Sequence, residues 1–297
     1  MTLTQFARPV TVGVLALQGA FAEHILLLRQ AANVLANGGI RRDAQWEFVE
    51  VRTRGELERC DALIIPGGES TTMSLVASRS GMLEPLREFV KVQRKPVWGT
   101  CAGLILLSES ANRTKKGGQE LIGGLDVRVN RNHFGRQVES FEADLDLPFL
   151  SDHTQKTAAN ENGHTETKST PFHTIFIRAP VVERILQHQP GAQLEEASKD
   201  DTVVAPSREP ASLSAKAAMV SEVEILTRLP PSAPSLDRQG ITAKDVGEDG
   251  DIVAVRQGNC FGTAFHPELT GDARIHVWWL GEVLESVERR EGERQIS

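Results

Sequence analysis

The stretch Lys95-Pro-Val-Trp-Gly-Thr-Cys-Ala-Gly-Leu-Ile-Leu-Leu-Ser108 joins two apolar runs through a turn of small residues. Residues 95–100 are predicted to form a buried strand and residues 102–108 a helix. Between them, Gly99-Thr-Cys101-Ala-Gly103 has the form of a nucleophile elbow, G-x-S-x-G, with cysteine in the serine position. Such a turn holds its side chain above the sheet, and a helix N-terminus behind it stabilises a thiolate. The pentapeptide alone is equally compatible with a buried structural cysteine.

Upstream of this turn, apolar runs alternate with segments of helical periodicity. Predicted strands cover residues 10–17, 46–51 and 61–66, and predicted helices begin at Phe21 and cover residues 70–78 and 82–93. Ser70 or Thr71 is the expected N-cap of the 70–78 helix. Strands that alternate with helices are typical of a mostly parallel α/β sheet.

Downstream of Leu125 the pattern changes to short strands without long helices between them. Strands are predicted over residues 126–130, 138–143 and 172–178, a hairpin over 252–257 and 260–265, and a closing helix over 274–290. The apolar stripe of that helix consists of Ile275, Trp279, Val283 and Val287. The expected fold is a single α/β domain, residues 1–297, with a mostly parallel central sheet and helices on both faces.

Three tracts contain too few apolar residues for their burial to offset the entropy lost when the chain becomes ordered. They cover residues 151–170, 188–215 and 229–250. We expect them to be flexible surface insertions between the parts of the chain that fold.

Composition excludes several classes of function. The formal net charge is -7, which disfavours binding to nucleic acid. The first apolar run is too short to span a bilayer and no secretory signal precedes it, so a cytoplasmic protein without membrane contact is expected. Three cysteines cannot form a disulfide framework. His153, His164, His173 and His188 are not at metal-ligand spacing, so no metal site is predicted.

Two further segments carry residues suited to chemistry. Phe265-His266-Pro-Glu268-Leu269 follows a predicted strand, and alternate residues of extended chain face the same way, so Glu268 can orient the His266 imidazole. A surface His-Pro turn is the alternative. Pro66-Gly-Gly-Glu-Ser-Thr-Thr72 also follows a strand, and its backbone N–H groups could hold a phosphate or an oxyanion, or form a plain connecting turn.

Together these segments resemble the class I glutamine amidotransferases and, within them, the glutaminase subunits of pyridoxal 5′-phosphate synthase. The matching stretches are 12–19 with Glu23-His24, 66–73, 98–103, 131–137, 176–180, 253–259 and 262–269. They are spread over most of the chain outside the polar tracts.

The resemblance implies a role for each matching residue. Cys101 would attack the carboxamide of L-glutamine, His266 would act as general base and acid, and Glu268 would orient it. Backbone N–H groups near Gly68 and of Ala102 would form the oxyanion hole. The residues implied to bind glutamine are Gly68, Glu69, Ser70, Arg131, Ile177 and Arg178.

The resemblance also implies a partner. The ammonia released from glutamine would pass to a synthase subunit that makes pyridoxal 5′-phosphate, and glutamine hydrolysis itself would need no metal or organic cofactor. Two alternatives stay open, namely a related enzyme on this scaffold (a glutaminase for a different synthase, or a cysteine peptidase) and a catalytically silent regulatory subunit.

Overall fold

The computed structural model describes residues 8–38, 44–112, 119–131, 133, 140–150, 170–230 and 250–296. All statements about the structure concern these residues. The expectations for 151–170 and 229–250 fall almost entirely outside them.

One half of the main sheet is parallel throughout and carries the predicted chemistry. It has the strand order β2-β1-β3-β4-β13. The strands are β1 (Val10–Leu15), β2 (Trp46–Val51), β3 (Ala62–Ile65), β4 (Val97–Thr100) and β13 (Cys260–Thr263). Their positions agree with the strands predicted from apolar runs.

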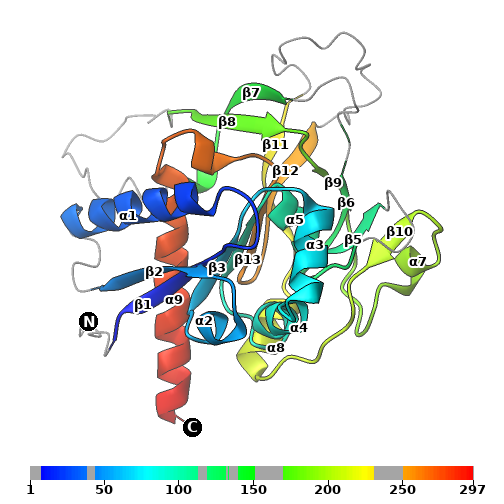
Figure 1. Ribbon diagram of the computed structural model, residues 1–297, viewed down its shortest axis with the longest axis horizontal. Helices are drawn as coiled ribbons and strands as arrows, with labels where there is room; N and C mark the ends of the chain where they lie inside the picture. The colour runs from blue at the N-terminus through cyan, green and yellow to red at the C-terminus, as the bar shows by residue number, and fades with distance from the viewer. Residues whose placement is uncertain are drawn as a thin grey trace, which may run out of the picture.

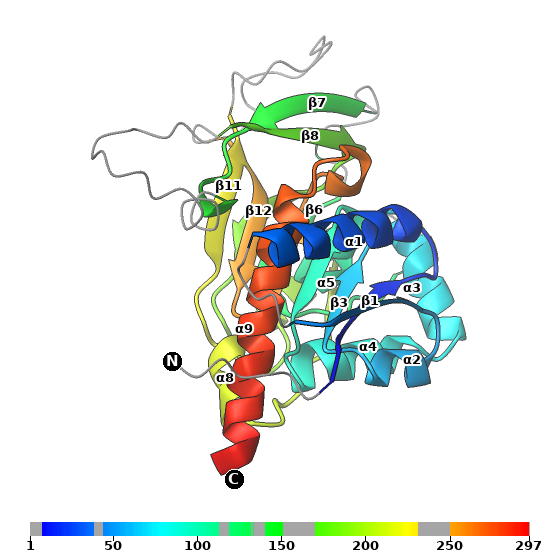
Figure 2. The ribbon, with the colours of Figure 1, turned by 90° about the vertical axis from the view of Figure 1, so that its left-hand side faces the viewer.

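The other half of the sheet is mixed and continues in the order β12-β9-β6-β5-β10. These strands are β5 (Ser108–Asn112), β6 (Leu125–Asn130), β9 (Val181–Ile185), β10 (Thr202–Val204) and β12 (Asp251–Gln257). β12 and β13 form the predicted antiparallel hairpin, and β11 (Glu224–Leu229) pairs with the other edge of β12. A separate two-stranded sheet, β7 (Ser140–Leu145) and β8 (Phe172–Ile177), lies beyond the end of the main sheet (Figure 2).

Helices cover both faces of the main sheet, which confirms the predicted fold class. On one face lie α1 (Phe21–Asn37) and α9 (Arg274–Ile296), which are drawn in blue and red in Figure 1. On the other lie α3 (Ser70–Arg79), α4 (Leu83–Arg87) and α5 (Ala102–Leu107). The short helices α2 (Arg54–Glu58), α7 (Leu194–Ala197) and α8 (Leu213–Met219) complete the fold, with η1 (Glu88–Val92), η2 (Pro148–Leu150) and η4 (Pro267–Leu269) as single turns.

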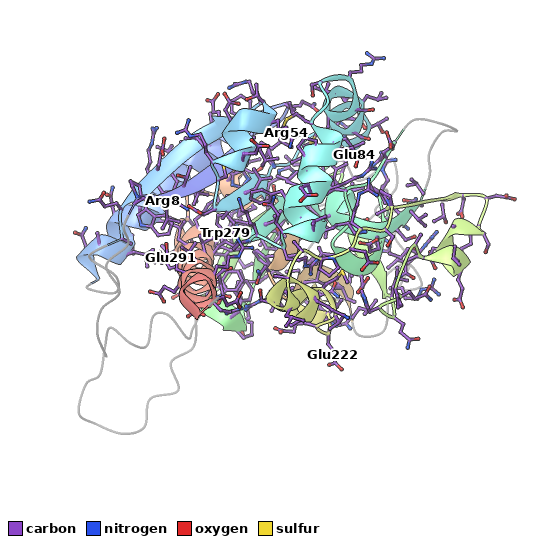
Figure 3. All side chains as sticks on the ribbon, turned by 90° about the horizontal axis from the view of Figure 1, so that it is seen from below. Arg8, Arg54, Glu84, Glu222, Trp279 and Glu291 are labelled. Carbon is purple, nitrogen blue, oxygen red and sulfur yellow. The ribbon has the colours of Figure 1, made fainter. Side chains whose placement is uncertain are left out.

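The apolar stripe of α9 packs against the sheet as its spacing predicts. All four of its members are buried: Ile275, Trp279, Val283 and Val287. In Figure 3, Trp279 lies near the centre of the view, whereas the exposed Glu222 points outward at its lower edge. Each buried side chain of this size contributes about 1.5–3 kcal/mol relative to exposure. The stripe therefore fixes α9 against the sheet.

Local structure departs from expectation at two helices. Glu69, and not Ser70 or Thr71, is the N-cap of α3, because its carboxylate accepts the backbone N–H groups of Thr71 and Thr72. The helix predicted over residues 82–93 begins as α4 and continues as a π-helical turn, η1.

Residues 188–215 differ from the flexible insertion that we expected. They contain α7, β10 and the start of α8, and β10 extends the main sheet by pairing with β5. The segment is held by charge. Glu196 is only 2% exposed and pairs with Arg128, Arg184 and Lys199.

Candidate active site

The elbow around Cys101 joins β4 to α5 and depends on two glycines. A Cβ atom on Gly99 would lie 2.5 Å from the carbonyl carbon of Gly103, and one on Gly103 would lie 2.0 Å from the carbonyl oxygen of Ile65. Cys101 itself adopts φ 49°, a left-handed conformation that costs a non-glycine residue energy. Its N–H donates to the Thr263 carbonyl at 2.8 Å, which ties the strained residue to β13.

His266 and Glu268 lie in the turn that follows β13, beside this elbow. Nδ1 of His266 is 2.7 Å from Oε1 of Glu268, and both residues are largely buried. The His266 backbone N–H donates to the Ile175 carbonyl of β8, which fixes the turn. A Cβ atom on Gly67 would lie 2.3 Å from Cε1 of His266, so the imidazole occupies space that only glycine leaves open.

The electrostatic surroundings favour a charged imidazole. Burial lowers the pKa of His266, but the hydrogen bonds and negative charges of Cys101 and Glu268 outweigh burial and raise this pKa to about 10. Burial raises the pKa of the Glu268 carboxyl, but neighbouring His24 and His266 outweigh it and hold that pKa below its usual value. The arrangement places a charged imidazole beside the Cys101 side chain, with a carboxylate behind the imidazole.

A cavity of about 340 Å³ opens above the elbow and gathers residues from distant parts of the chain. It is lined by Gln18, Gly68, Glu69, Ser70, Cys101, Ile105, Arg131, Ile177, Arg178 and His266. The structure thus brings all six residues implied to bind glutamine to one cavity with Cys101 and His266. Glu268 lies behind His266, and Ala102 begins α5, where the first amides of a helix lack helical partners.

Two of the residues that line the cavity, Gln18 and Ile105, are not among those predicted from the sequence. Ile105 is one helical turn beyond Cys101 on α5, a spacing that could have indicated it. Gln18 follows β1 and accepts the Glu69 backbone N–H at 3.2 Å. Nothing in its sequence context indicates that contact.

Charged groups at one side of the cavity suit a free amino acid. The Arg131 guanidinium is 8% exposed and donates to the hydroxyls of Ser70 and Thr71, each at 2.9 Å. The Glu69 carboxylate lies 3.9 Å from it. A cation and an anion side by side match the carboxylate and ammonium groups of an amino acid.

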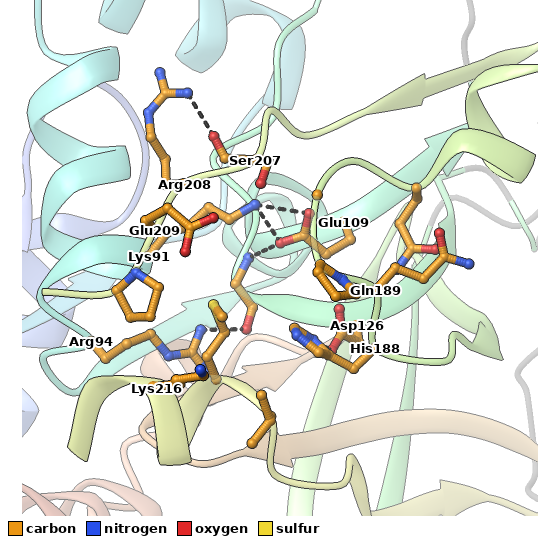
Figure 4. Close-up of a pocket in the computed structure, with 17 residues that line it drawn as sticks. Lys91, Arg94, Glu109, Asp126, His188, Gln189, Ser207, Arg208, Glu209 and Lys216 are labelled. Atoms are coloured by element: carbon orange, nitrogen blue, oxygen red, sulfur yellow. Dashed lines mark hydrogen bonds and ion pairs between the residues drawn. The ribbon is translucent and has the colours of Figure 1, made fainter. Parts of the chain in front are cut away.

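A second cavity, of about 210 Å³, contains more charge but no comparable chemistry (Figure 4). There the Lys91 ammonium is 2.8 Å from the Glu109 carboxylate, and the Asp126 carboxylate is 2.8 Å from Nδ1 of His188. The Arg94 guanidinium donates to backbone carbonyls of Gly124 and other residues. These charges pair with one another and with the backbone, which is typical of a structural role.

Other candidate features are absent from the described ranges. No group of three or more His, Cys, Asp or Glu side chains there could hold a metal ion. In the same ranges, no helix combines the length and the apolar character that crossing a bilayer requires. Cys60 and Cys260 are buried in the core, and burial raises the pKa of the Cys60 thiol to about 12, so it is unreactive at neutral pH.

Comparison with known proteins gives consistent results. The sequence pattern of the SNO glutamine amidotransferase family matches residues 14–218. A protein of Arabidopsis thaliana named a probable pyridoxal 5′-phosphate synthase subunit is 40% identical over 91% of this chain and 85% of its own length. A pyridoxal 5′-phosphate synthase subunit of Methanosarcina mazei is 35% identical over 92% of this chain and 98% of its own. A crystal structure of a glutamine amidotransferase is 33% identical over 92% of this chain and 98% of its own, with a TM-score of 0.56. The chain belongs to the SNO glutamine amidotransferase family.

Proposed function

We propose that this chain is the glutaminase subunit of a pyridoxal 5′-phosphate synthase, and that it hydrolyses L-glutamine to L-glutamate and ammonia. The observation that carries the proposal is the cavity in which Cys101 and His266 meet Arg131 and Glu69, since it combines a nucleophile and base with groups for an amino acid. Family membership supports the same reaction class.

The reaction begins when the Cys101 thiolate attacks the side-chain carbonyl carbon of glutamine. The tetrahedral oxyanion accepts hydrogen bonds from the Ala102 N–H and from backbone N–H groups at Gly68. His266 gives its proton to the leaving amine, so ammonia departs and a γ-glutamyl thioester remains on Cys101. His266 then removes a proton from water, which attacks the thioester and releases glutamate.

The remaining residues orient the substrate and the base. The Arg131 guanidinium pairs with the α-carboxylate and the Glu69 carboxylate with the α-ammonium group of glutamine. Ser70, Ile177 and Arg178 complete the cavity wall. Glu268 holds His266 by its Nδ1–H and stabilises the imidazolium. Every step uses side chains and water, so the proposed hydrolysis requires no metal or organic cofactor.

The partner is proposed from the relatives. They are named as pyridoxal 5′-phosphate synthase subunits, and this chain matches them over 85% and 98% of their lengths. The ammonia would pass to the synthase subunit of the same complex. Three free cysteines fit the reducing cytoplasm in which we place this reaction.

The proposal is tested with the Cys101→Ala variant in complex with the synthase subunit. We expect no glutamate release and no vitamin formation from glutamine, with full vitamin formation when ammonium salt replaces glutamine. Glutamate release by the pure variant at the wild-type rate would show that Cys101 is not the nucleophile.

A further inference from the structure

Two histidines that the proposed mechanism does not use lie directly behind Glu268. His24 of α1 and His276 of α9 are both completely buried, and Nδ1 of His24 is 3.0 Å from Nε2 of His276. Both imidazoles pack against the Trp98 indole, with centroid separations of 5.6 and 4.8 Å. The contact joins α1 to α9 on the face of the sheet behind the catalytic turn.

The other nitrogen of His24 lies between the Thr100 hydroxyl and the carboxylate of the turn after β13. Its Nε2 lies 3.4 Å from Oε2 of Glu268 and 3.4 Å from the Thr100 hydroxyl oxygen. Oε2 of Glu268 is buried, and among the described residues it has no hydrogen bond of standard geometry. A buried carboxylate oxygen without a donor costs free energy, so the nearest N–H group matters to it.

The hydrogen-bond pattern selects one arrangement of protons. If Nε2–H of His276 donates to Nδ1 of His24, then His24 carries its proton on Nε2, on the side where the Thr100 hydroxyl and the Glu268 carboxylate lie. The opposite arrangement would turn a lone pair of His24 toward a carboxylate. It would also bury the Nδ1–H of His276, an atom for which the described residues offer no acceptor.

We infer that His24, held in this tautomer by His276, is a positioning residue that fixes the Glu268 carboxylate for His266. The inference rests on the proposed function and extends it from three side chains to five. Oε1 of Glu268 binds His266, while His24 faces Oε2 and restrains rotation of the carboxylate. His276 acts through His24 and contacts no reacting atom.

Burial keeps this pair neutral. Burial lowers the pKa of His24, and it lowers the pKa of His276 well below its ordinary value. The titratable groups that face His24 are Glu268 and His266 from the turn after β13, His276 from α9 and Glu23 from its own helix. The His24 N–H favours the charged form of Glu268, so its removal would raise the pKa of Glu268. Glu268 would then become protonated at a higher pH, and the acid limb of the activity profile would move to higher pH with it.

The test compares two amides at position 24. In His24→Gln the amide nitrogen is the same number of bonds from Cβ as Nε2, so it can still face Glu268. In His24→Asn the nitrogen is one bond shorter and cannot. Each variant is assayed in the complex for glutamate release between pH 5 and 9, and its melting temperature is measured alongside.

We expect His24→Asn to lose about 10-fold in kcat, the low end of the loss known when a metal-binding histidine loses its hydrogen-bond partner, with KM for glutamine nearly unchanged. Its acid limb should move to higher pH, and His24→Gln should restore most of both. A wild-type kcat and pH profile in His24→Asn would overturn the inference. The inference would also be overturned if both variants lost kcat equally and the loss paralleled a fall in melting temperature.

A second variant decides the matter if His24→Asn does not fold. His276→Phe fills the same space without a donor, so it should shift the acid limb in the same direction by less. An unshifted profile would overturn the inference.

Wild type and Cys101→Ala are assayed in parallel. If the wild type releases no glutamate, or Cys101→Ala releases it, the proposed function fails. If the wild type is active, Cys101→Ala is inactive and the His24 variants behave like the wild type, only this inference fails.

Discussion

Glu268 and Glu196 are both buried, yet the fold surrounds them in opposite ways. Glu268 makes one short contact, to His266, and faces His24 with its other oxygen. Glu196 is surrounded by Arg128, Arg184, Lys199 and the Ser110 hydroxyl. Among the described residues the first carboxylate has few partners, and it lies beside the imidazole that we propose exchanges a proton. The second has its hydrogen-bonding capacity filled and holds a segment in place.

The difference teaches how a buried charge should be interpreted. A carboxylate whose partners are cations and hydroxyls stabilises the fold, and changing it should alter stability. A carboxylate whose partner is a titrating imidazole beside a strained cysteine supports chemistry, and changing it should alter rate. Measuring rate and stability on the same variant separates the two effects.

The largest effect is expected at the catalytic turn. His266→Ala should lower kcat by about 10⁴-fold, the upper end of the range for general acid–base catalysis. Glu268→Gln should be milder, on the order of 10²-fold, because Glu268 orients the imidazole but moves no proton itself. Steady-state glutamate release measures both, with melting temperatures as the control. Near-wild-type rates for both variants would end the triad assignment.

The opposite outcome is expected at Glu196. Glu196→Gln should lower the free energy of unfolding by about 3 kcal/mol, because buried Arg128 loses its buried carboxylate partner and keeps the more exposed Glu183. Its kcat at 25 °C should be unchanged. Denaturant unfolding measures the loss, and Glu195→Gln is the matched control, since Glu195 is an exposed neighbour on the same helix. A rate defect in Glu196→Gln without loss of stability would break the comparison.

A pH titration of stability sharpens the contrast further. Burial raises the pKa of Glu196, but hydrogen bonds from Lys199, Arg128 and Ser110 outweigh it and lower that pKa from 4.5 to about 2. Because the folded value is depressed, the stabilisation is complete above the unfolded pKa and is lost as the pH falls from about 4.5 toward 2. The melting temperature of the wild type should therefore fall more steeply over this window than that of Glu196→Gln. Parallel curves would contradict the assignment.

The smallest effect is expected from removing residues 151–170. A polar tract contributes little burial, so its replacement by a short glycine-rich linker should leave kcat and melting temperature nearly unchanged. Loss of soluble protein on deletion would show that this tract packs against the domain as residues 188–215 do.

The parallel half of the sheet and the candidate site could be predicted because their signals are local. Apolar runs, the glycines around Cys101 and the two-residue spacing of His266 and Glu268 each lie within a few positions of sequence. Resemblance then implied the residues that we propose bind glutamine, and these residues line one cavity in the structure.

The remaining features depend on contacts between distant segments. No local pattern pairs Glu196 with Arg128, 68 positions away, so the polar composition of residues 188–215 predicts flexibility where the structure has order. His24 and His276 are 252 positions apart, and neither stands in a motif that predicts the contact. Glu69 replaced the expected N-cap because a longer carboxylate reaches two backbone amides at once.

The central claim is that Cys101 is the nucleophile of a glutaminase and that His266 activates it. The most direct measurement is mass spectrometry of the synthase complex after treatment with an electrophilic glutamine analogue. The account predicts one adduct, on the peptide that carries Cys101, slowed by excess glutamine and by His266→Ala, with Cys60 and Cys260 unmodified. An adduct elsewhere, or labelling of Cys101 at the same rate in His266→Ala, would contradict it.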